Sequence, residues 1–445
     1  EVTEDDFAIV FRHRVKGTEF NKVLVKMSEF DFRDLVSGLV DWRLISYDET
    51  KKTYTIHPLI KTFFESTFDM GNKKHCHKHI YQYFGLYAPE QPETLEEMHP
   101  LFEQIYHGCA AGLYDEVFNN IYWGKIHRGK KHFVLHSLGA WETDLSLVRT
   151  FFQEDDLSQM PLVSEKSNQS WLINTAGLAL LAIGRPKEAE EPFLSGVKMA
   201  IEDKNWENAS VGYFNLTILQ FQSGEFESGL ESAKKALDAA DKADSIVDII
   251  NPKAYLAWIL HLMGKDKEAE KGFKEADELS IEIEGNRLRT FSGVRYADFL
   301  ISMKRIDEAY ELTKQNLVIC QRQNWTNHIS SCNRCLGAIE RIRGNHKEAE
   351  VHLQNALELA HKVGVPDLEI EAMLESNRLQ LDLGRHKDAI RAANEVLKIC
   401  ARTGFKFYEP ETEIVLSKAY LALNDIEQAK TFVHSAYEKA IAMNY

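Results

Sequence analysis

The chain has 445 residues, 44% of them hydrophobic, and a formal net charge of −15. That length is enough for about three ordinary domains, and the hydrophobic content excludes a disordered chain. The acidic balance argues against a protein that grips the phosphates of nucleic acids or anionic lipids. Six unevenly placed cysteines do not make a disulfide framework, and no apolar run is long enough to span a bilayer, so we expect a cytoplasmic chain.

Residues 1–70 have the pattern of a small separate domain. An amphipathic stripe over residues 32–40 predicts a helix, and residues 42–47 and 53–57 predict two strands joined by a polar turn. Pro58 suits the first turn of a following helix. Helices followed by a two-stranded hairpin predict a winged helix. Two other apolar-periodic segments precede the stripe, at residues 7–11 and 20–27.

A winged helix often binds DNA, but the charges of this one argue against that partner. The helix that would enter the groove, at about residues 31–44, carries Asp31, Asp34 and Asp41 against two arginines. Phosphates would repel such a helix, so we do not expect DNA to bind here.

A more specific resemblance lies around the hairpin, in Leu39, Leu44-Ile45 and the run Tyr54-Thr55-Ile56-His57-Pro58-Leu59-Ile60. These residues resemble the winged-helix domain that follows the nucleotide-binding domain in STAND proteins, the signal transduction ATPases with numerous domains. The resemblance implies that His57 senses the ADP phosphate in the full-length protein. The Asp of that family's Met-His-Asp motif is absent, because Pro58 follows His57. The alternative is that His57 only packs the wing onto a helix.

Residues 71–165 are predicted to form a helical arm. Residues 94–103 and 107–116 resemble the arm between winged helix and sensor in large bacterial STAND proteins. The stretch at residues 112–117 is itself a diverged helix-turn-helix turn. The resemblance covers the whole of this chain, which would correspond to the C-terminal half of a STAND protein. It therefore implies that ATP or ADP binds an upstream domain and that this chain holds no cofactor itself.

Residues 124–131 nearly match the phosphate-binding loop G-x-x-x-x-G-K-[ST]. Lys131 stands where that loop needs a hydroxyl group for Mg²⁺. The residues before the match continue a helix, so no buried strand leads into it. We interpret this segment as a basic turn rather than a nucleotide site.

Two other motifs could carry chemistry. His75 and His79 would share one face of a helix as a zinc pair, but nothing marks a third or fourth ligand. Cys332 and Cys335 form a Cys-x-x-Cys, but they lie inside a predicted helix at packing positions, not after a strand. We therefore expect no metal site and no redox site. No catalytic arrangement of side chains is found either, so the chain is not predicted to be an enzyme.

The remaining residues, 166–445, repeat with a period of 40. A small residue marks each unit, at Ala189, Gly229, Ala269, Ala309, Ala349, Ala389 and Ala429. We call this small residue the anchor. Five residues earlier stands a glycine in most units, which suits a left-handed helix end. The residues four, seven and eleven positions after the anchor are mostly apolar or small, as one buried helical face requires. Each unit is thus predicted to be a pair of helices that buries its apolar face by stacking.

This pattern resembles the tetratricopeptide repeat. Small residues in the first helix and around the anchor match that family, whereas the period of 40 is longer than its usual 34. The predicted fold class is therefore all-α: a tetratricopeptide-like α-solenoid of seven helix pairs, preceded by the arm and the winged helix.

In the tetratricopeptide family, ligand contacts come from particular first-helix positions on the concave face. Carried over by their distance from the anchor, these positions give the candidate ligand-binding residues Phe214, Trp258, Asp298, Arg334, Arg341 and Arg378. Aromatic anchors together with arginines suit a peptide or protein ligand. For each residue taken singly, the alternative is that the aromatic rings are core and the arginines are solvated.

Together these features predict the regulatory and sensor half of a STAND ATPase. It would bind an inducer or trigger protein on the repeat superhelix and so control the upstream nucleotide-binding domain. The alternative is a free-standing tetratricopeptide scaffold that assembles other proteins without a nucleotide switch.

Overall fold

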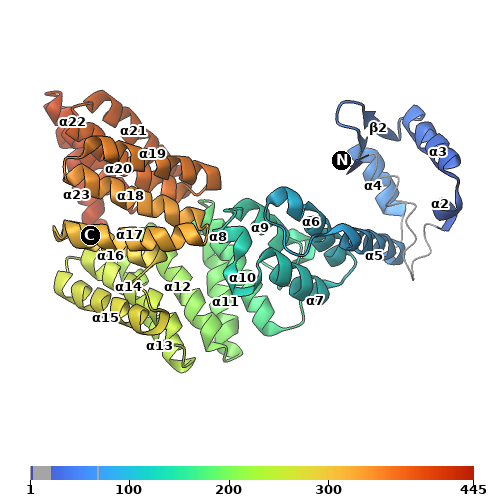
Figure 1. The fold of residues 1–445 in the computed structure, drawn as a ribbon, viewed down its shortest axis with the longest axis horizontal. Coiled ribbons are helices and arrows are strands. Elements are labelled where there is room, and N and C mark those ends of the chain that lie inside the picture. Colours follow the sequence, from blue (N-terminus) through green and yellow to red (C-terminus); the bar gives the residue numbers. More distant parts are fainter. Residues whose placement is uncertain (1, 4–21, 68–69) are drawn as a thin grey trace. The chain divides into compact units, whose positions relative to one another are not determined.

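The computed structural model describes residues 2–3, 22–67 and 70–445 (Figure 1). The chain forms two compact units, residues 1–130 and 131–445. The predicted division at residues 70 and 165 is a finer one, and it stays a prediction.

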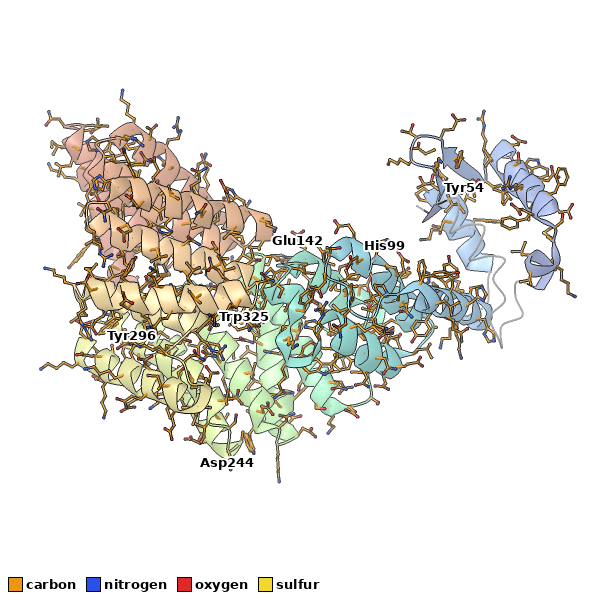
Figure 2. The ribbon with its side chains drawn as sticks, viewed as in Figure 1. Tyr54, His99, Glu142, Asp244, Tyr296 and Trp325 are labelled. Atoms are coloured by element: carbon orange, nitrogen blue, oxygen red, sulfur yellow. The ribbon has the colours of Figure 1, made fainter. Side chains whose placement is uncertain are left out.

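The first unit contains the predicted hairpin. Strands β2 (Ile45–Asp48) and β3 (Thr53–Ile56) are antiparallel, and β1 (Val2–Thr3) pairs with the other edge of β3. Asp48 tightens the turn, because its Oδ1 accepts hydrogen bonds from the amides of Thr50 and Lys51 at 2.9 and 3.0 Å. Tyr54, labelled in Figure 2, packs its ring 4.8 Å from that of Tyr47. The predicted hairpin is therefore confirmed, but its first strand starts at Ile45 and not at Trp42, because residues 42–44 form the turn that follows the preceding helix.

Helices precede and follow the hairpin, as expected. They are α2 (Lys22–Lys26), α3 (Glu29–Asp41) and α4 (Pro58–Thr67). Ser28 caps α3, because its hydroxyl accepts a hydrogen bond from the Asp31 amide at 3.1 Å. The segment at residues 7–11 lies outside the described residues, so the winged helix as a whole stays a prediction.

Helical segments complete the first unit. They are α5 (Met70–Tyr87), α6 (Leu95–Ala110), α7 (Tyr114–Val117), the π-helix η1 (Phe118–Ile126) and the 3₁₀ turn η2 (Gly129–Lys131). Met98, Leu101 and Ile105 line the buried side of α6 at helical spacing. The near match to a phosphate-binding loop thus starts inside a π-helix, and no strand leads into it.

The second unit starts with α8 (Phe133–His136), α9 (Trp141–Arg149) and the 3₁₀ turn η3 (Gln153–Asp155). Seven helix pairs follow and stack side by side (Figure 1). The pairs are α10 (Lys166–Ala182) with α11 (Pro186–Glu202), α12 (Trp206–Gln222) with α13 (Phe226–Lys242), α14 (Val247–Leu262) with α15 (Asp266–Glu284), α16 (Thr290–Ser302) with α17 (Ile306–Arg322), α18 (Thr326–Ile342) with α19 (His346–Val363), α20 (Pro366–Asp382) with α21 (His386–Thr403), and α22 (Tyr408–Ala422) with α23 (Ile426–Met443). The predicted all-α solenoid of seven pairs is confirmed.

Small residues let the two helices of a pair approach closely. Ala189 and Phe193 are fully buried, and a Cβ atom added at Gly177 would lie 2.8 Å from the Phe193 ring. In the third and fourth pairs, the rings of Phe273 and Tyr296 stack with centroids 4.9 Å apart. Burying such a side chain contributes about 1.5–3 kcal/mol. The core of each pair is therefore shared with the next.

A left-handed residue links the two helices of each pair. Gly184 has φ of +81°, a conformation that is costly for residues with a Cβ atom. Lys304 and Asn424 hold the same position in two pairs, with φ of +61° and +64°.

Among the described residues, no helix has both the length and the hydropathy to cross a bilayer.

Candidate ligand-binding surface

All six candidate ligand-binding residues lie on first helices of the repeats. They are Phe214 on α12, Trp258 on α14, Asp298 on α16, Arg334 and Arg341 on α18, and Arg378 on α20. The structure divides them into two groups. Trp258 and Arg334 are buried, whereas Phe214, Asp298, Arg341 and Arg378 are partly exposed.

Trp258 is covered by a neighbouring first helix, and 7% of its surface is exposed. The guanidinium of Arg295, on α16, lies 5.6 Å from the Trp258 ring and 5.3 Å from the Phe221 ring. Such cation–π contacts are worth more when they are desolvated. Trp258 is therefore held against the chain's own arginine and does not stand open to a ligand.

Arg295 belongs to a largely buried group of charges that we call the interior charge cluster: Arg295, Asp298, Arg334 and Glu371. Arg295 lies 2.6 Å from Glu371 Oε1. Arg334 donates to Glu371 Oε2 at 3.1 Å and to Asp298 Oδ2 at 2.9 Å. Burial would raise the pKa of Glu371, but the charges of the two arginines outweigh it and lower that pKa. The cluster thus balances two cations against two anions.

Tyr408, at the start of α22, extends the cluster. Its hydroxyl donates to Glu371 Oε1 at 3.1 Å and also contacts Asp367. Burial, reinforced by the charge of Glu371, raises the pKa of Asp367 to about 6, although Arg295 opposes the shift. Asp367 therefore changes its charge near neutral pH, whereas Glu371 stays ionised.

The solvent-reaching residues are paired as well, but more openly. Arg341 donates to Glu375 at 2.6 Å and to Asp382 at 2.8 Å. Arg378 bridges Glu375 and Glu411 at 2.8 and 2.5 Å, and about a third of its side chain is exposed.

Phe214 is half-buried, and its ring meets Tyr255 edge to face at 5.1 Å. Phe214, Arg341 and Arg378 thus keep part of their surface exposed.

Sequence reasoning identified the arginines of this face but missed their acidic partners. Glu371, Glu375 and Glu411 lie 37, 34 and 33 residues after the arginines that they bind. A separation slightly shorter than the 40-residue period is the signal that could have found them. Arg295 was missed because it lies one position beyond the slot carried over from the family.

His57, the predicted phosphate sensor, lies at the start of α4. Its Nδ1 accepts a hydrogen bond from the Leu59 amide at 3.2 Å, and the residue is exposed. It caps the helix after the wing, as side-chain acceptors do at a helix N-terminus. The structure thus gives His57 a local role, and its phosphate-sensing role stays a prediction.

The histidine pair and the Cys-x-x-Cys motif, which the sequence did not favour as chemical sites, both lie in helices. His79 is fully buried in α5, whereas His75 is exposed and its Nδ1 lies 3.0 Å from the Gly71 carbonyl. No cluster of three potential metal ligands occurs in the part of the chain that the structure describes. Cys332 and Cys335 are fully buried in α18, as predicted for packing positions.

Comparison with known proteins supports the repeat assignment. Residues 329–402 match the tetratricopeptide repeat family model. This segment contains most of α18 and all of α19 and α20, and most of α21. A search of curated proteins found no match.

Solved structures resemble the chain at low identity. A Rap protein in complex with competence and sporulation factor is 12% identical over 78% of this chain and 99% of its own, with a TM-score of 0.47. The apo quorum sensor NprR from B. thuringiensis is 12% identical over 92% of this chain and 99% of its own, with a TM-score of 0.41.

A STAND protein with a tetratricopeptide repeat sensor, from Pyrococcus horikoshii, is 13% identical over 99% of this chain, with a TM-score of 0.39. The chain spans 57% of the length of that protein.

Proposed function

We propose that this chain binds a peptide or protein trigger on the concave face of its repeat superhelix. The observation that supports this most is the row of aromatic and charged side chains across successive first helices. That row reaches solvent at Phe214, Arg341 and Arg378. Partly exposed arginines with carboxylate partners can exchange those partners for the carboxylates of a ligand.

We further propose that the chain is the regulatory and sensor part of a STAND ATPase. Residues 1–70 would act as its winged helix, and His57 would sense ADP held by an upstream domain. The hairpin followed by α4 supports this assignment, with His57 at their junction. In this proposal the protein is cytoplasmic, and the chain itself is neither an enzyme nor the holder of a cofactor.

The binding function can be tested by selecting peptides from a random library on the whole chain. We expect selected peptides to lose at least tenfold in affinity on Arg378→Glu, because an anchor residue is worth about 2 kcal/mol or more. Arg391→Glu is the matched control. Arg391 pairs with Asp388 at 2.9 Å but lies on the second helix α21, so its change should leave affinity within about twofold.

Selected peptides that bind equally well to both variants would contradict the concave-face proposal. A free-standing scaffold is the second candidate function, and nothing about the concave face separates it from a sensor. The reading frame upstream of the chain separates them, because a strand followed by a phosphate-binding loop is expected only for the ATPase.

A further inference from the structure

Turns far apart along the repeats touch one another. A Cβ atom added at Gly184 would lie 2.8 Å from Thr403 Cγ2 and 3.1 Å from Pro366 Cγ, and one at Gly224 would lie 2.9 Å from Met443 Sδ. The first two repeats therefore contact the last two, and we call this contact the seam. The glycines at the same turn position in other repeats meet nothing within 4 Å among the described residues: Gly264, Gly344 and Gly384.

The seam joins residues more than five repeats apart. Asn444 donates to Glu227 at 2.8 Å across 217 residues, and the Tyr445 ring lies 6.0 Å from that of Phe226. A solenoid that turns by a fixed amount at each repeat meets itself after one full turn. The seam therefore marks where the superhelix closes.

The segment at residues 404–408, which links α21 to the first residue of α22, takes part in the seam. The Phe407 ring lies 4.5 Å from that of Phe221, and its amide donates to the carbonyl oxygen of Gln222 at 3.2 Å. Phe405 and Tyr408 are also buried. Phe221 occupies a first-helix position of the kind from which ligand contacts were expected. An aromatic residue of the chain itself thus covers the concave face.

The same segment reaches the interior charge cluster. Tyr408, next to Phe407, donates its hydroxyl to Glu371, and Glu371 holds Arg295 over Trp258 and Phe221. One short segment therefore contacts the aromatic and the charged parts of the concave face, as a bound peptide would.

Residues 404–408 leave some buried polar atoms near the concave face without hydrogen-bond partners. Trp258 Nε1, Arg295 Nε and Gln222 Oε1 are buried and find no hydrogen-bond partner among the described residues. Buried polar atoms without partners are uncommon in folded proteins and need an explanation. A peptide backbone offers both donors and acceptors, so a ligand could satisfy what residues 404–408 leave unsatisfied.

We propose that residues 404–408 occupy the concave face of repeats two and three in place of a ligand, and that a peptide with an aromatic anchor displaces them and opens the seam. This inference rests on the proposed function, because it concerns access to the same face. It names the ligand class: an aromatic side chain in the place of Phe407, followed by a hydrogen-bond donor in the place of the Tyr408 hydroxyl.

The first measurement asks whether the seam controls the segment. Gly184→Asn places a side chain in the seam, whereas Gly344→Asn places it in open space. Both glycines have nearly the same φ, +81° and +82°, and Asn424 already holds this turn position. In the whole chain, Gly184→Asn should speed hydrogen exchange at residues 404–408 at least about tenfold, and Gly344→Asn by less than about twofold.

The second measurement uses a labelled synthetic peptide of residues 404–409 as the probe. A tethered segment competes at an effective concentration in the millimolar range, so the wild-type chain should bind the peptide weakly. The Gly184→Asn and Phe407→Ala chains should bind it at least about tenfold more tightly than the wild type and Gly344→Asn. The same peptide with alanine at the Phe407 position should show no such gain.

Unchanged exchange in both Gly184→Asn and Phe407→Ala would overturn the inference. So would faster exchange without tighter binding of the peptide. If library-selected peptides still depend on Arg378 in that case, the concave face binds ligands but residues 404–408 do not mimic them. If those peptides are indifferent to Arg378, the proposed function itself fails.

Discussion

The first and second helices of the repeats use their charged residues in different ways. On the first helices, Arg334 binds Asp298 and Glu371, whose positions lie 36 and 37 residues away in the neighbouring repeats. On the second helices several pairs are local. Lys242 binds Asp238 one helical turn away, with 48% and 66% of the two side chains exposed. The ion pairs of Arg334 on its first helix therefore connect repeats. The pair of Lys242 with Asp238 stabilises only its own second helix.

Burial explains the difference. A charge that leaves water must be balanced by partners, so removing one partner from a buried group is costly. An exposed pair gains little, because water and salt compete with it. We therefore expect the buried pairs on the first helices to matter more for stability than the exposed pairs on the second helices. Three changes test this contrast.

The largest effect is expected for Glu371→Gln. The change leaves Arg295 and Arg334 buried without an anion, and it should lower the free energy of unfolding by about 3–5 kcal/mol. Urea denaturation followed by circular dichroism measures this. Glu369→Gln is the control on the same helix, because Glu369 pairs with the exposed His361 at 3.1 Å. It should cost less than about 1 kcal/mol, and equal losses would show that the inner cluster is not special.

The second effect is a pH dependence at Asp367. Its pKa is raised from 3.8 to about 6 by burial and by Glu371, while Arg295, Tyr408 and Gln222 on other helices favour its charged form. A raised pKa means that the folded chain holds the proton more tightly than the unfolded chain does. The stability from this group is therefore fully present below about pH 3.8 and is lost as the pH rises through about 6.

Asp367→Asn should remove this dependence. At pH 7.5 the variant should be more stable than the wild type by on the order of 2–3 kcal/mol, and by roughly half as much at pH 5. Denaturation of both chains across this range gives the difference directly. A difference that does not change with pH would mean that Asp367 is solvated like an ordinary surface carboxylate.

The smallest effect is expected for Asp238→Asn on the outer helix α13. Losing its exposed pair with Lys242 should change stability by no more than about 0.5 kcal/mol. The change should shrink further in 1 M salt, because screening weakens exposed pairs. A loss as large as that of Glu371→Gln would remove the distinction between the two faces.

Much of the repeat region could be predicted from the sequence. The anchor residues such as Ala189 and the turn residues such as Gly184 lie where the period placed them. Local geometry explains this success, because helix pairing depends on residues close in the chain. The candidate ligand surface could be predicted only as a set of first-helix positions. Trp258 and Arg334 occupy those positions, but Arg295 and Glu371 cover and bind them from other repeats.

The sequence by itself determined the helix pair, its period, its turns and the helices that form the inner face. Each of these depends on short-range patterns: apolar spacing, small residues at close approaches, and residues that tolerate positive φ. Only the tertiary structure decided that residues 404–408 lie against the concave face. The superhelix closes on itself because each repeat adds a small rotation. Phe407 meets Phe221, and Asn444 meets Glu227, only after that rotation completes a turn. No local sequence pattern encodes where the superhelix completes its turn. The residues that contact the concave face from distant repeats could therefore not be predicted from the sequence.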